Sequence, residues 1–407
     1  MLGLTATRKI NRKERILTVV QFLFCFSAMV DPTNLFRTKL PLFALLIALL
    51  AIGHYIIDRR ILLNYILLMV AQYASCCMLS LINEPIDNAF MLQNLFFFMT
   101  FLVFVWSKDL NIDKVMIVSS IIVSLISIFG LVVMYINPEI ESILFGYVQG
   151  EDTQLWLMAR REFLGVELAQ FFYKSTPAII VPYSIVVYKL IYSDKDKLRF
   201  FIISILMFGA LFSSAQRTII GVGVLIPIMI GYKRFKMFYI FKIMTFFVGV
   251  FVVVVLYKVI TEAGNGSTEE KAGHLGSYMA YYYSHLQYCL FGTGPGALFY
   301  SKGYNAVVCQ TEWVYLDIFK MYGIVGGVII MSFFLYPFKF LIKYRKYGYY
   351  YALFIGYAAF LLVSAQNPFL LASTGLIAMY YTYSEVKNPD LLQKYKKISY
   401  RYDLSTI

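Results

Sequence analysis

Arg217 is the charged residue whose position most strongly suggests chemistry. It ends Ser213-Ser214-Ala215-Gln216-Arg217, a short polar break between two apolar stretches. The nearest flanking charges are Arg199 and Lys233, so two membrane crossings and their turn must share residues 200–232. Each crossing then has about 17 residues, or about 25 Å of helix, against a hydrocarbon core of about 30 Å. We expect a recessed turn, where an arginine costs about 3 kcal/mol and would meet a phosphate at headgroup depth.

Two further cations lie in a predicted outer loop. Arg160 and Arg161 are adjacent, and guanidinium groups match phosphate oxygens in pairs. One of them could therefore reach a diphosphate beside Arg217. Two other roles remain open, since the pair could anchor the loop to phospholipid and Arg217 could pair with an outer carboxylate.

Glu312 is the residue best placed to act as a general base. It begins an apolar run at the predicted outer surface, and Asp317 follows five residues further in. In a recessed cavity a carboxylate could take a proton from a hydroxyl nucleophile. The alternative is a structural role, because a glutamate at a helix N-terminus interacts favourably with the helix dipole.

Gly292, Gly294 and Gly296 form a closely spaced glycine cluster. The cluster follows a probable helix rather than a strand, and no P-loop lysine comes after it, so a nucleotide site is not indicated. We predict a tight turn that permits close backbone approach. The sequence shows no metal-ligand spacing, and Cys289 and Cys309 could pair only if their shared loop faces an oxidising space.

The composition indicates that membrane-spanning helices position these residues. The chain is 60% hydrophobic and 14% charged, with a mean hydropathy of +0.69, whereas soluble domains are about 25% charged. We therefore predict a single all-α integral membrane domain over residues 1–407. The net charge of +13 is divided among short basic clusters between apolar runs, which is typical of the positive-inside rule and excludes nucleic-acid binding.

The apolar runs predict about twelve transmembrane helices. They cover residues 16–30, 40–57, 61–82, 89–106, 115–136, 177–192, 200–213, 218–232, 237–259, 313–341, 351–367 and 369–384. With both termini in the cytoplasm, most Lys and Arg residues face the cytoplasm, including those of a basic tail over 385–407.

Two long outer loops complete this topology, at residues 137–176 and 260–312. Within the first, Asp152 to Lys174 mixes apolar and charged residues and predicts an amphipathic helix on the outer surface. The second begins polar and glycine-rich, from Glu262 to Gly276. It continues into an aromatic helix, Tyr278 to Tyr288.

Over about residues 200–384 the chain resembles the O-antigen polymerase and ligase superfamily, with its Wzy-type polymerases. Ser213 to Arg217 is similar to the family's Ser-x-Arg-type segment, and Leu290 to Gly296 to its G-x-G-x-G turn. Gln310 to Leu316, followed by Tyr322 to Gly326, resembles the start of the next helix. Asn367-Pro368-Phe369-Leu370, before the last span, is also similar.

The chain departs from the family pattern at two positions. His274 stands where many members have an arginine, which leaves open whether it still contacts phosphate. Glu312 stands where ligases carry a histidine, which weakens the ligase interpretation more than the polymerase one.

The resemblance implies an enzyme that joins undecaprenyl-diphosphate-linked oligosaccharide repeats into surface polysaccharide. It would act in the inner membrane of a bacterium, with its active site facing the periplasm. A hydroxyl of one repeat would attack the anomeric carbon of another, and undecaprenyl diphosphate would leave. No cofactor or metal is expected. Donor, acceptor and membrane lipid are the partners, and a chain-length regulator is a further one.

The same resemblance assigns roles to the candidate residues. Arg217, Arg160 or Arg161, and His274 would bind the diphosphate, and Glu312 would be the base. Tyr278, Tyr282 and Tyr315 would contact sugars, although loop tyrosines could instead form an interfacial belt. The rival functions are a flippase for the same lipid-linked repeats and an O-antigen ligase. A flippase would be expected to show two related halves, which the sequence does not show.

Overall fold

The structure is a computed structural model of the chain. It describes residues 12–53, 55–79, 85–109, 112–136, 139, 142–143, 155–163, 166–193, 195–234, 266–284, 286–365, 368–388, 391 and 393. Within these residues the fold is mostly helical, as predicted, and most of the basic tail lies outside them.

Helices make up most of the described chain. In order they are α1 (Arg12–Val30), α2 (Lys39–Ile52), α3 (Arg59–Leu79), α4 (Asn88–Met99), η1 (Thr100–Asp109), α5 (Asp113–Ile136), η2 (Thr176–Ile179), α7 (Ile180–Tyr192), α8 (Lys197–Ser213), α9 (Arg217–Arg234), α11 (Gly266–Ser284), η3 (Leu286–Tyr288), α12 (Val314–Tyr344), α13 (Gly348–Ser364) and α14 (Ser373–Lys387). Each predicted span overlaps one or two of these helices except residues 237–259, which lie outside the described residues.

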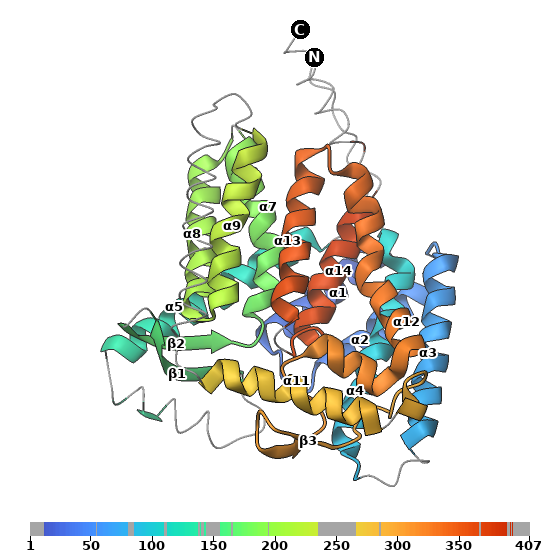
Figure 1. Cartoon of the computed structure of the whole chain (residues 1–407). Helices are drawn as coiled ribbons and strands as arrows, with labels where there is room; N and C mark the ends of the chain where they lie inside the picture. Colours follow the sequence, from blue (N-terminus) through green and yellow to red (C-terminus); the bar gives the residue numbers. More distant parts are fainter. Residues whose placement is uncertain are drawn as a thin grey trace.

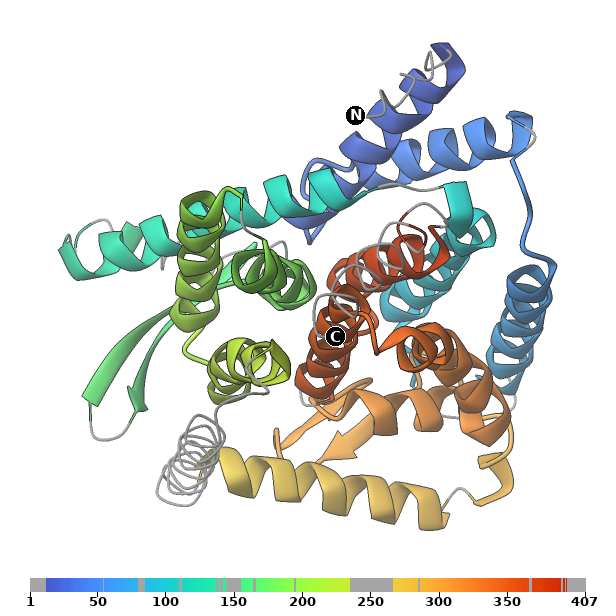
Figure 2. The same cartoon turned by 90° about the horizontal axis from the view of Figure 1, so that it is seen from above.

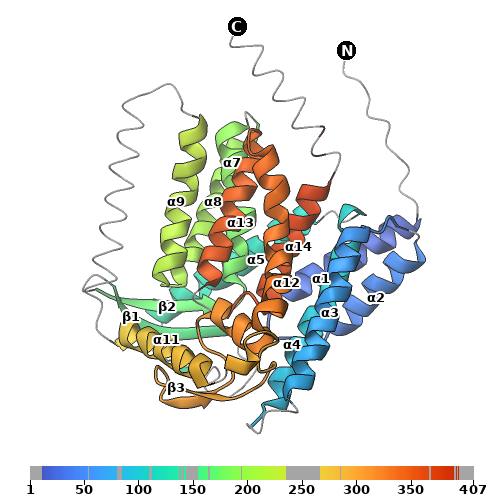
Figure 3. The same cartoon turned by 45° about the vertical axis from the view of Figure 1, so that its right-hand side comes forward.

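Four helical segments are long and apolar enough to cross a membrane. They are Arg59–Leu79, Asn88–Trp106, Asp113–Ile136 and Val314–Tyr344, and the described chain also has several shorter apolar helices. These segments indicate a multi-pass membrane protein. In Figure 1, α7, α8, α9 and α13 stand side by side, and α11 runs across one end of this group. Figure 2, seen from above, shows that α11 lies along the edge of the molecule beside this group, and Figure 3 shows the fold turned to one side.

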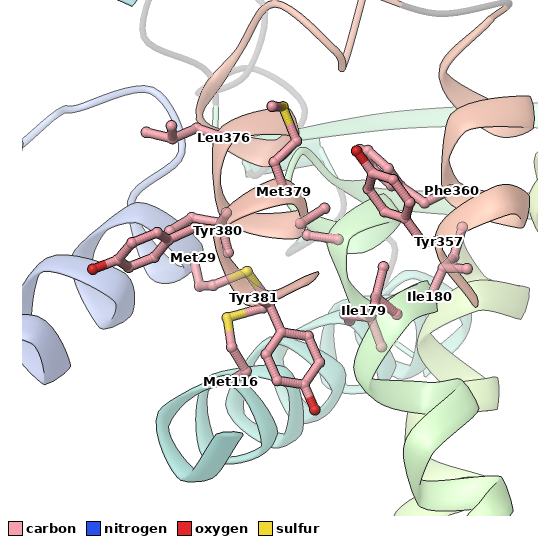
Figure 4. Packing of buried hydrophobic residues seen from close by; sticks show 14 of the residues in the cluster. Met29, Met116, Ile179, Ile180, Tyr357, Phe360, Leu376, Met379, Tyr380 and Tyr381 are labelled. Atoms are coloured by element: carbon pink, nitrogen blue, oxygen red, sulfur yellow. The ribbon is translucent and has the colours of Figure 1, made fainter. Parts of the chain in front are cut away.

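Aromatic and sulfur-containing side chains fill the interior between these helices. Figure 4 shows Met29 of α1 and Met116 of α5 beside Tyr380 and Tyr381 of α14. All four side chains are buried. The Tyr381 hydroxyl donates to Asp113 Oδ1 at 2.7 Å, so the packed core also fixes the start of α5.

Two ion pairs join helix ends on one side of the bundle. Lys387 Nζ lies 2.7 Å from Asp58 Oδ2, and Lys189 Nζ lies 3.2 Å from Asp113 Oδ2. The first pair joins the end of α14 to the residue before α3, and the second joins the end of α7 to the start of α5. All four residues belong to segments that the charge pattern assigns to the cytoplasmic side.

The first long loop differs from the prediction. The prediction of an amphipathic helix from Asp152 to Lys174 is wrong, because β1 (Trp156–Phe163) and β2 (Val166–Tyr173) form an antiparallel hairpin there. Phe171, Phe172 and Tyr173 are buried in succession. A strand points successive side chains to opposite faces, so three consecutive buried aromatics suit a strand covered on both sides. The all-α expectation therefore fails in this loop.

The second long loop contains more regular structure than the sequence predicts. Helix α11 begins at Gly266, inside the polar stretch expected to precede it, and ends at Ser284 before η3. The short strands β3 (Phe299–Ser301) and β4 (Ala306–Val308) then form a second hairpin. Figure 1 places α11 and β3 at the same end of the molecule as β1 and β2.

The predicted glycine turn is confirmed. Gly292, Gly294 and Gly296 have φ values of 77°, 88° and 95°. The turn docks on α12 where that helix breaks at Gly323, whose φ is 62°. A Cβ on Gly292 would collide with the Met321 carbonyl, and one on Gly323 would collide with the Gly292 nitrogen. The two backbones therefore meet at a distance that only glycine permits.

Candidate functional site

Arg217 lies at a buried break in the chain. Helix α8 ends at Ser213 and α9 begins at Arg217, and Ala215 between them has a left-handed φ of 46°. Ser213 and Ser214 are buried, while Arg217 itself is partly buried. The polar segment identified in the sequence is thus a sharp turn whose first residues are shielded and whose arginine lies at its edge.

The position of Arg217 is electrostatically unusual. It occupies the first turn of an 18-residue helix that has no acidic residue in that turn. A helix N-terminus carries partial positive charge, so an arginine there is unfavourable by about 0.3–1 kcal/mol for the helix alone. A cation beside the first-turn N–H groups of a helix adds to the positive potential there, which attracts anions.

The β1–β2 hairpin is fastened to this break. Gln170 Nε2 donates to the Ser214 carbonyl at 2.6 Å. Ala159 pairs with Gln170, so the neighbouring Arg160 points to the opposite face of the hairpin, and its side chain is exposed. Arg161 pairs with Leu168, and its side chain lies outside the described residues. The hairpin therefore covers the Arg217 break, while Arg160 faces away from it.

Glu312 lies at the start of α12, beside α11. Its Oε2 atom is 3.9 Å from Lys271 Nζ, and the two side chains are 35% and 32% exposed. Burial raises the pKa of the nearby Tyr304 to about 12, with smaller contributions from the charges of Glu312 and Glu270. Glu312 is thus partly exposed and ion-paired with Lys271, at a position where a carboxylate could accept a proton from a hydroxyl.

A buried network centred on Asp317 stands behind Glu312. The Tyr278 hydroxyl donates to Asp317 Oδ1, and the Thr311 N–H donates to Oδ2 at 3.1 Å. Burial, followed by the Asp317 charge, raises the pKa of Tyr278 well above its ordinary value. The Tyr278 ring is buried against Phe299. In this structure Tyr278 fixes α11 to α12 and presents no ring to a sugar.

Lys320 is a residue that our sequence analysis missed. It is a buried cation within the predicted span 313–341, where a lysine is itself a signal of a special role. Its Nζ atom donates to the carbonyls of Ala297 at 2.8 Å and Cys309 at 2.7 Å, and lies 4.3 Å from the Phe299 ring centroid. Lys320 therefore joins α12 to the glycine turn and to the end of the second hairpin.

His274 is buried on the inner face of α11. Its Nδ1 atom is 2.6 Å from Ser301 Oγ, and its buried Nε2 atom has no hydrogen-bond partner within the described part of the chain. Burial is the main cause of a lowered His274 pKa; Lys271 lowers it further, and Glu270 opposes the shift. His274 is therefore neutral near pH 7, and any phosphate contact would be a neutral hydrogen bond.

The remaining candidate residues support the same framework. The Tyr282 hydroxyl donates to the Leu316 carbonyl at 3.1 Å, and the Tyr315 hydroxyl to the Leu361 carbonyl at 2.9 Å. The second bond ties α12 to α13. Cys289 and Cys309, whose pairing the sequence leaves open, are both free thiols.

The structure thus gathers His274, Tyr278, Tyr282 and Glu312 around the start of α12, and places Arg217 at the start of α9. Helix α13 packs against both α9 and α12. Figure 1 shows the starts of α9 and α12 at the same end of the molecule, beside the hairpin and α11. Within the described residues, no group of three His, Cys, Asp or Glu side chains is arranged to hold a metal. No protein-family model matches the chain, and no curated protein matches it significantly.

Proposed function

We propose that this chain is a membrane glycosyltransferase that polymerises undecaprenyl-diphosphate-linked oligosaccharide repeats into an O-antigen-type surface polysaccharide. One observation carries the proposal. A partly buried arginine occupies the positive end of α9, at a turn that a hairpin covers. A lipid-linked diphosphate would bring negative charge to this positive position.

In the proposed reaction Glu312 would act on the nucleophile and Arg217 on the leaving group. A hydroxyl of the acceptor repeat attacks the anomeric carbon of the donor chain, and Glu312 takes the hydroxyl proton. The bond between that carbon and the diphosphate oxygen breaks, and its electron pair leaves with undecaprenyl diphosphate. Arg217 and the N–H groups of α9 stabilise the negative charge that develops on the leaving group.

Arg160, Arg161 and His274 have secondary roles in this proposal. Arg160 is exposed and faces away from the break, so it would attract the anionic substrate rather than bind its diphosphate. His274 is neutral and would orient its surroundings through Ser301. Tyr282 and Tyr315 would line the approach to Glu312, and Tyr278 would fix the position of α12 through Asp317.

The proposed location is the cytoplasmic membrane of a bacterium, with this site on the periplasmic side. The four long apolar helices support the membrane. The excess of Lys and Arg in the segments that the charge pattern assigns to the cytoplasm supports the orientation. A chain-length regulator remains a proposed partner.

The proposal is tested with purified protein in nanodiscs that contain a lipid-linked repeat. The expected product of the wild type is a lipid-linked dimer and longer oligomers, detected by mass spectrometry. Arg217→Ala should lower the rate by about 100-fold or more, as loss of a charge-stabilising donor does. Arg199→Ala is the matched control, since Arg199 is an exposed arginine in the first turn of the neighbouring helix α8. Its rate should stay within about twofold of wild type.

Two results would contradict the proposal. One is coupling of repeats at the wild-type rate by the Arg217→Ala protein. The other is transfer of labelled lipid-linked repeats between leaflets without any coupling, which would indicate a flippase.

A further inference from the structure

The segment from Ala272 to Ser301 has an unusual composition for an extramembrane loop. It contains no Asp, Glu, Lys or Arg over 30 residues, although the predicted outer loop around it is charged at both ends. Helix α11 makes up the first part of this segment and η3 follows it. A water-exposed loop of this length normally carries charges, so a different environment is indicated.

The exposed face of α11 is apolar. Leu275, Met279 and Tyr283 recur every four residues and are 46%, 52% and 72% exposed. Residues four apart lie on one face of a helix. The opposite face, which includes His274 and Tyr278, is buried against β3 and α12. The helix thus has an inner face held by polar contacts and an outer face whose Leu275, Met279 and Tyr283 are exposed in the described part of the chain.

Hydrogen bonds join the end of this segment to the ends of two apolar helical segments. Ser75 Oγ, near the end of α3, donates to the Phe291 carbonyl at 3.0 Å. The Ile324 and Val325 N–H groups, directly after the break in α12 at Gly323, donate to the carbonyls of Cys289 and Leu290 at 2.8 and 3.0 Å. Both α3 and α12 are long and apolar enough to cross a membrane. Residues 289–291 therefore lie beside the ends of two such segments, where a membrane-spanning helix meets the headgroup region.

The apolar face of α11 also continues into the apolar surface of α12. Leu286 and Leu290 extend it towards Ile324, which is exposed like Val328 one turn further along α12. In Figure 2, α11 lies lengthwise at the edge of the molecule, outside β3 and the start of α12. Its free face thus points away from the bundle, in the direction in which lipid surrounds a membrane protein.

We propose that α11 and the chain up to Phe291 are embedded in the outer leaflet, with lipid acyl chains covering Leu275, Met279 and Tyr283. The predicted outer loop is then partly a membrane-bound element. Glu312 and Lys271 lie beside its polar face, at the boundary between lipid and water. This inference rests on the membrane character of the chain and is independent of the proposed reaction.

The test uses single cysteines in a full-length chain whose five native cysteines are replaced by serine. Leu275→Cys, Met279→Cys and Tyr283→Cys each carry a fluorescent label in nanodiscs. A nitroxide-bearing phospholipid and aqueous iodide are the two quenchers. Val328→Cys on α12 is the lipid control, and Val307→Cys on β4 is the water control; both positions are 59% exposed.

We expect the three α11 labels to follow Val328. The nitroxide lipid should quench them at least twice as strongly as it quenches the Val307 label, and iodide should quench them less. Labels that behave like Val307 would overturn the proposal. Labels that neither quencher reaches would also overturn it, because a protein partner would then cover the face.

A second measurement uses the wild-type chain and so does not depend on the cysteine substitutions. A phospholipid with a diazirine in its acyl chain is activated by light, and the labelled peptides are mapped by mass spectrometry. Labelling within residues 272–291, at a level comparable with α12, is expected. Labelling of α12 without labelling of this segment would contradict the proposal.

Discussion

Among single residues, Arg217 and Glu312 have opposite effects on the electrostatic stability of the helices that begin beside them. A carboxylate near the start of α12 is favourable for that helix, whereas an arginine in the first turn of α9 is unfavourable. The favourable residue has a structural explanation as well as a chemical one. The proposed diphosphate ligand would offset the unfavourable charge of Arg217 at this position.

Glu312→Gln tests the proposed base. The amide keeps the size of the side chain and loses its ability to accept a proton, so we expect coupling to fall by about 100-fold. Glu269→Gln is the matched control, since Glu269 is an exposed glutamate in the first turn of α11. Retained activity in Glu312→Gln, with the fold intact, would reduce Glu312 to a helix-terminal residue.

His274 predicts a dependence of stability on pH. Its pKa in the fold is below the ordinary value of 6.5, chiefly because the ring is buried. Below pH 6.5 the unfolded chain therefore binds a proton that the folded chain resists, and stability falls as the pH falls. His274→Asn should show a smaller drop in melting temperature between pH 7.5 and pH 5.5 than wild type. An identical drop in both proteins would show that His274 contributes no such linkage.

At the scale of elements, the contact between the glycine turn and the broken helix α12 sets the geometry of the site. The Thr293 and Gly294 N–H groups each donate at 2.9 Å, to the carbonyls of Lys320 and Met321. The Lys320 ammonium group donates a hydrogen bond to the Ala297 carbonyl, at the end of the turn. These bonds satisfy backbone groups that the break in α12 exposes. The start of α12, which Glu312 precedes, is therefore held by the turn.

Gly323→Ala tests this contact. Alanine at a φ of 62° is strained, and its Cβ would collide with Gly292 and Leu290. We expect a loss of stability on the order of 2 kcal/mol or more, measured by thermal unfolding in nanodiscs. Gly276→Ala is the matched control, because a Cβ there meets nothing within 4 Å and helix propensity favours alanine. Equal stability of the two variants would contradict the assigned role.

Gln170→Ala tests the attachment of the hairpin. The change leaves the buried Ser214 carbonyl without its 2.6 Å hydrogen bond, which costs about 1–3 kcal/mol. We expect faster proteolysis within the β1–β2 hairpin and lower coupling activity, with the helical content unchanged in circular dichroism. Wild-type resistance of the hairpin to protease would show that this bond does not hold it.

The sequence predicts the helices well because long apolar runs leave few alternatives in a membrane. It also predicts the glycine turn, since clustered glycines indicate positive φ. It fails for the first hairpin, where Arg160, Arg161 and Glu162 interrupt the apolar pattern and only packing distinguishes strand from helix. It also fails for Lys320 and for the Tyr278–Asp317 contact, which depend on which parts of the fold meet.

In the molecule as a whole, one end of the bundle would be the catalytic face of the proposed enzyme. The start of α9, the hairpin, α11 and the start of α12 are gathered there. The undecaprenyl chain would anchor both the substrate and the product in the membrane. An outer face partly embedded in lipid would let a lipid-linked headgroup reach Arg217 and Glu312 laterally.

The most direct measurement is a gel of surface polysaccharide from cells that lack this chain. Complementation with the wild type should restore a ladder of long polymers, and Arg217→Ala should leave only core molecules that carry a single repeat. Loss of every repeat from the surface of the deletion strain would contradict the account and indicate a flippase or a ligase. An unchanged ladder in that strain would contradict any role in polymerisation.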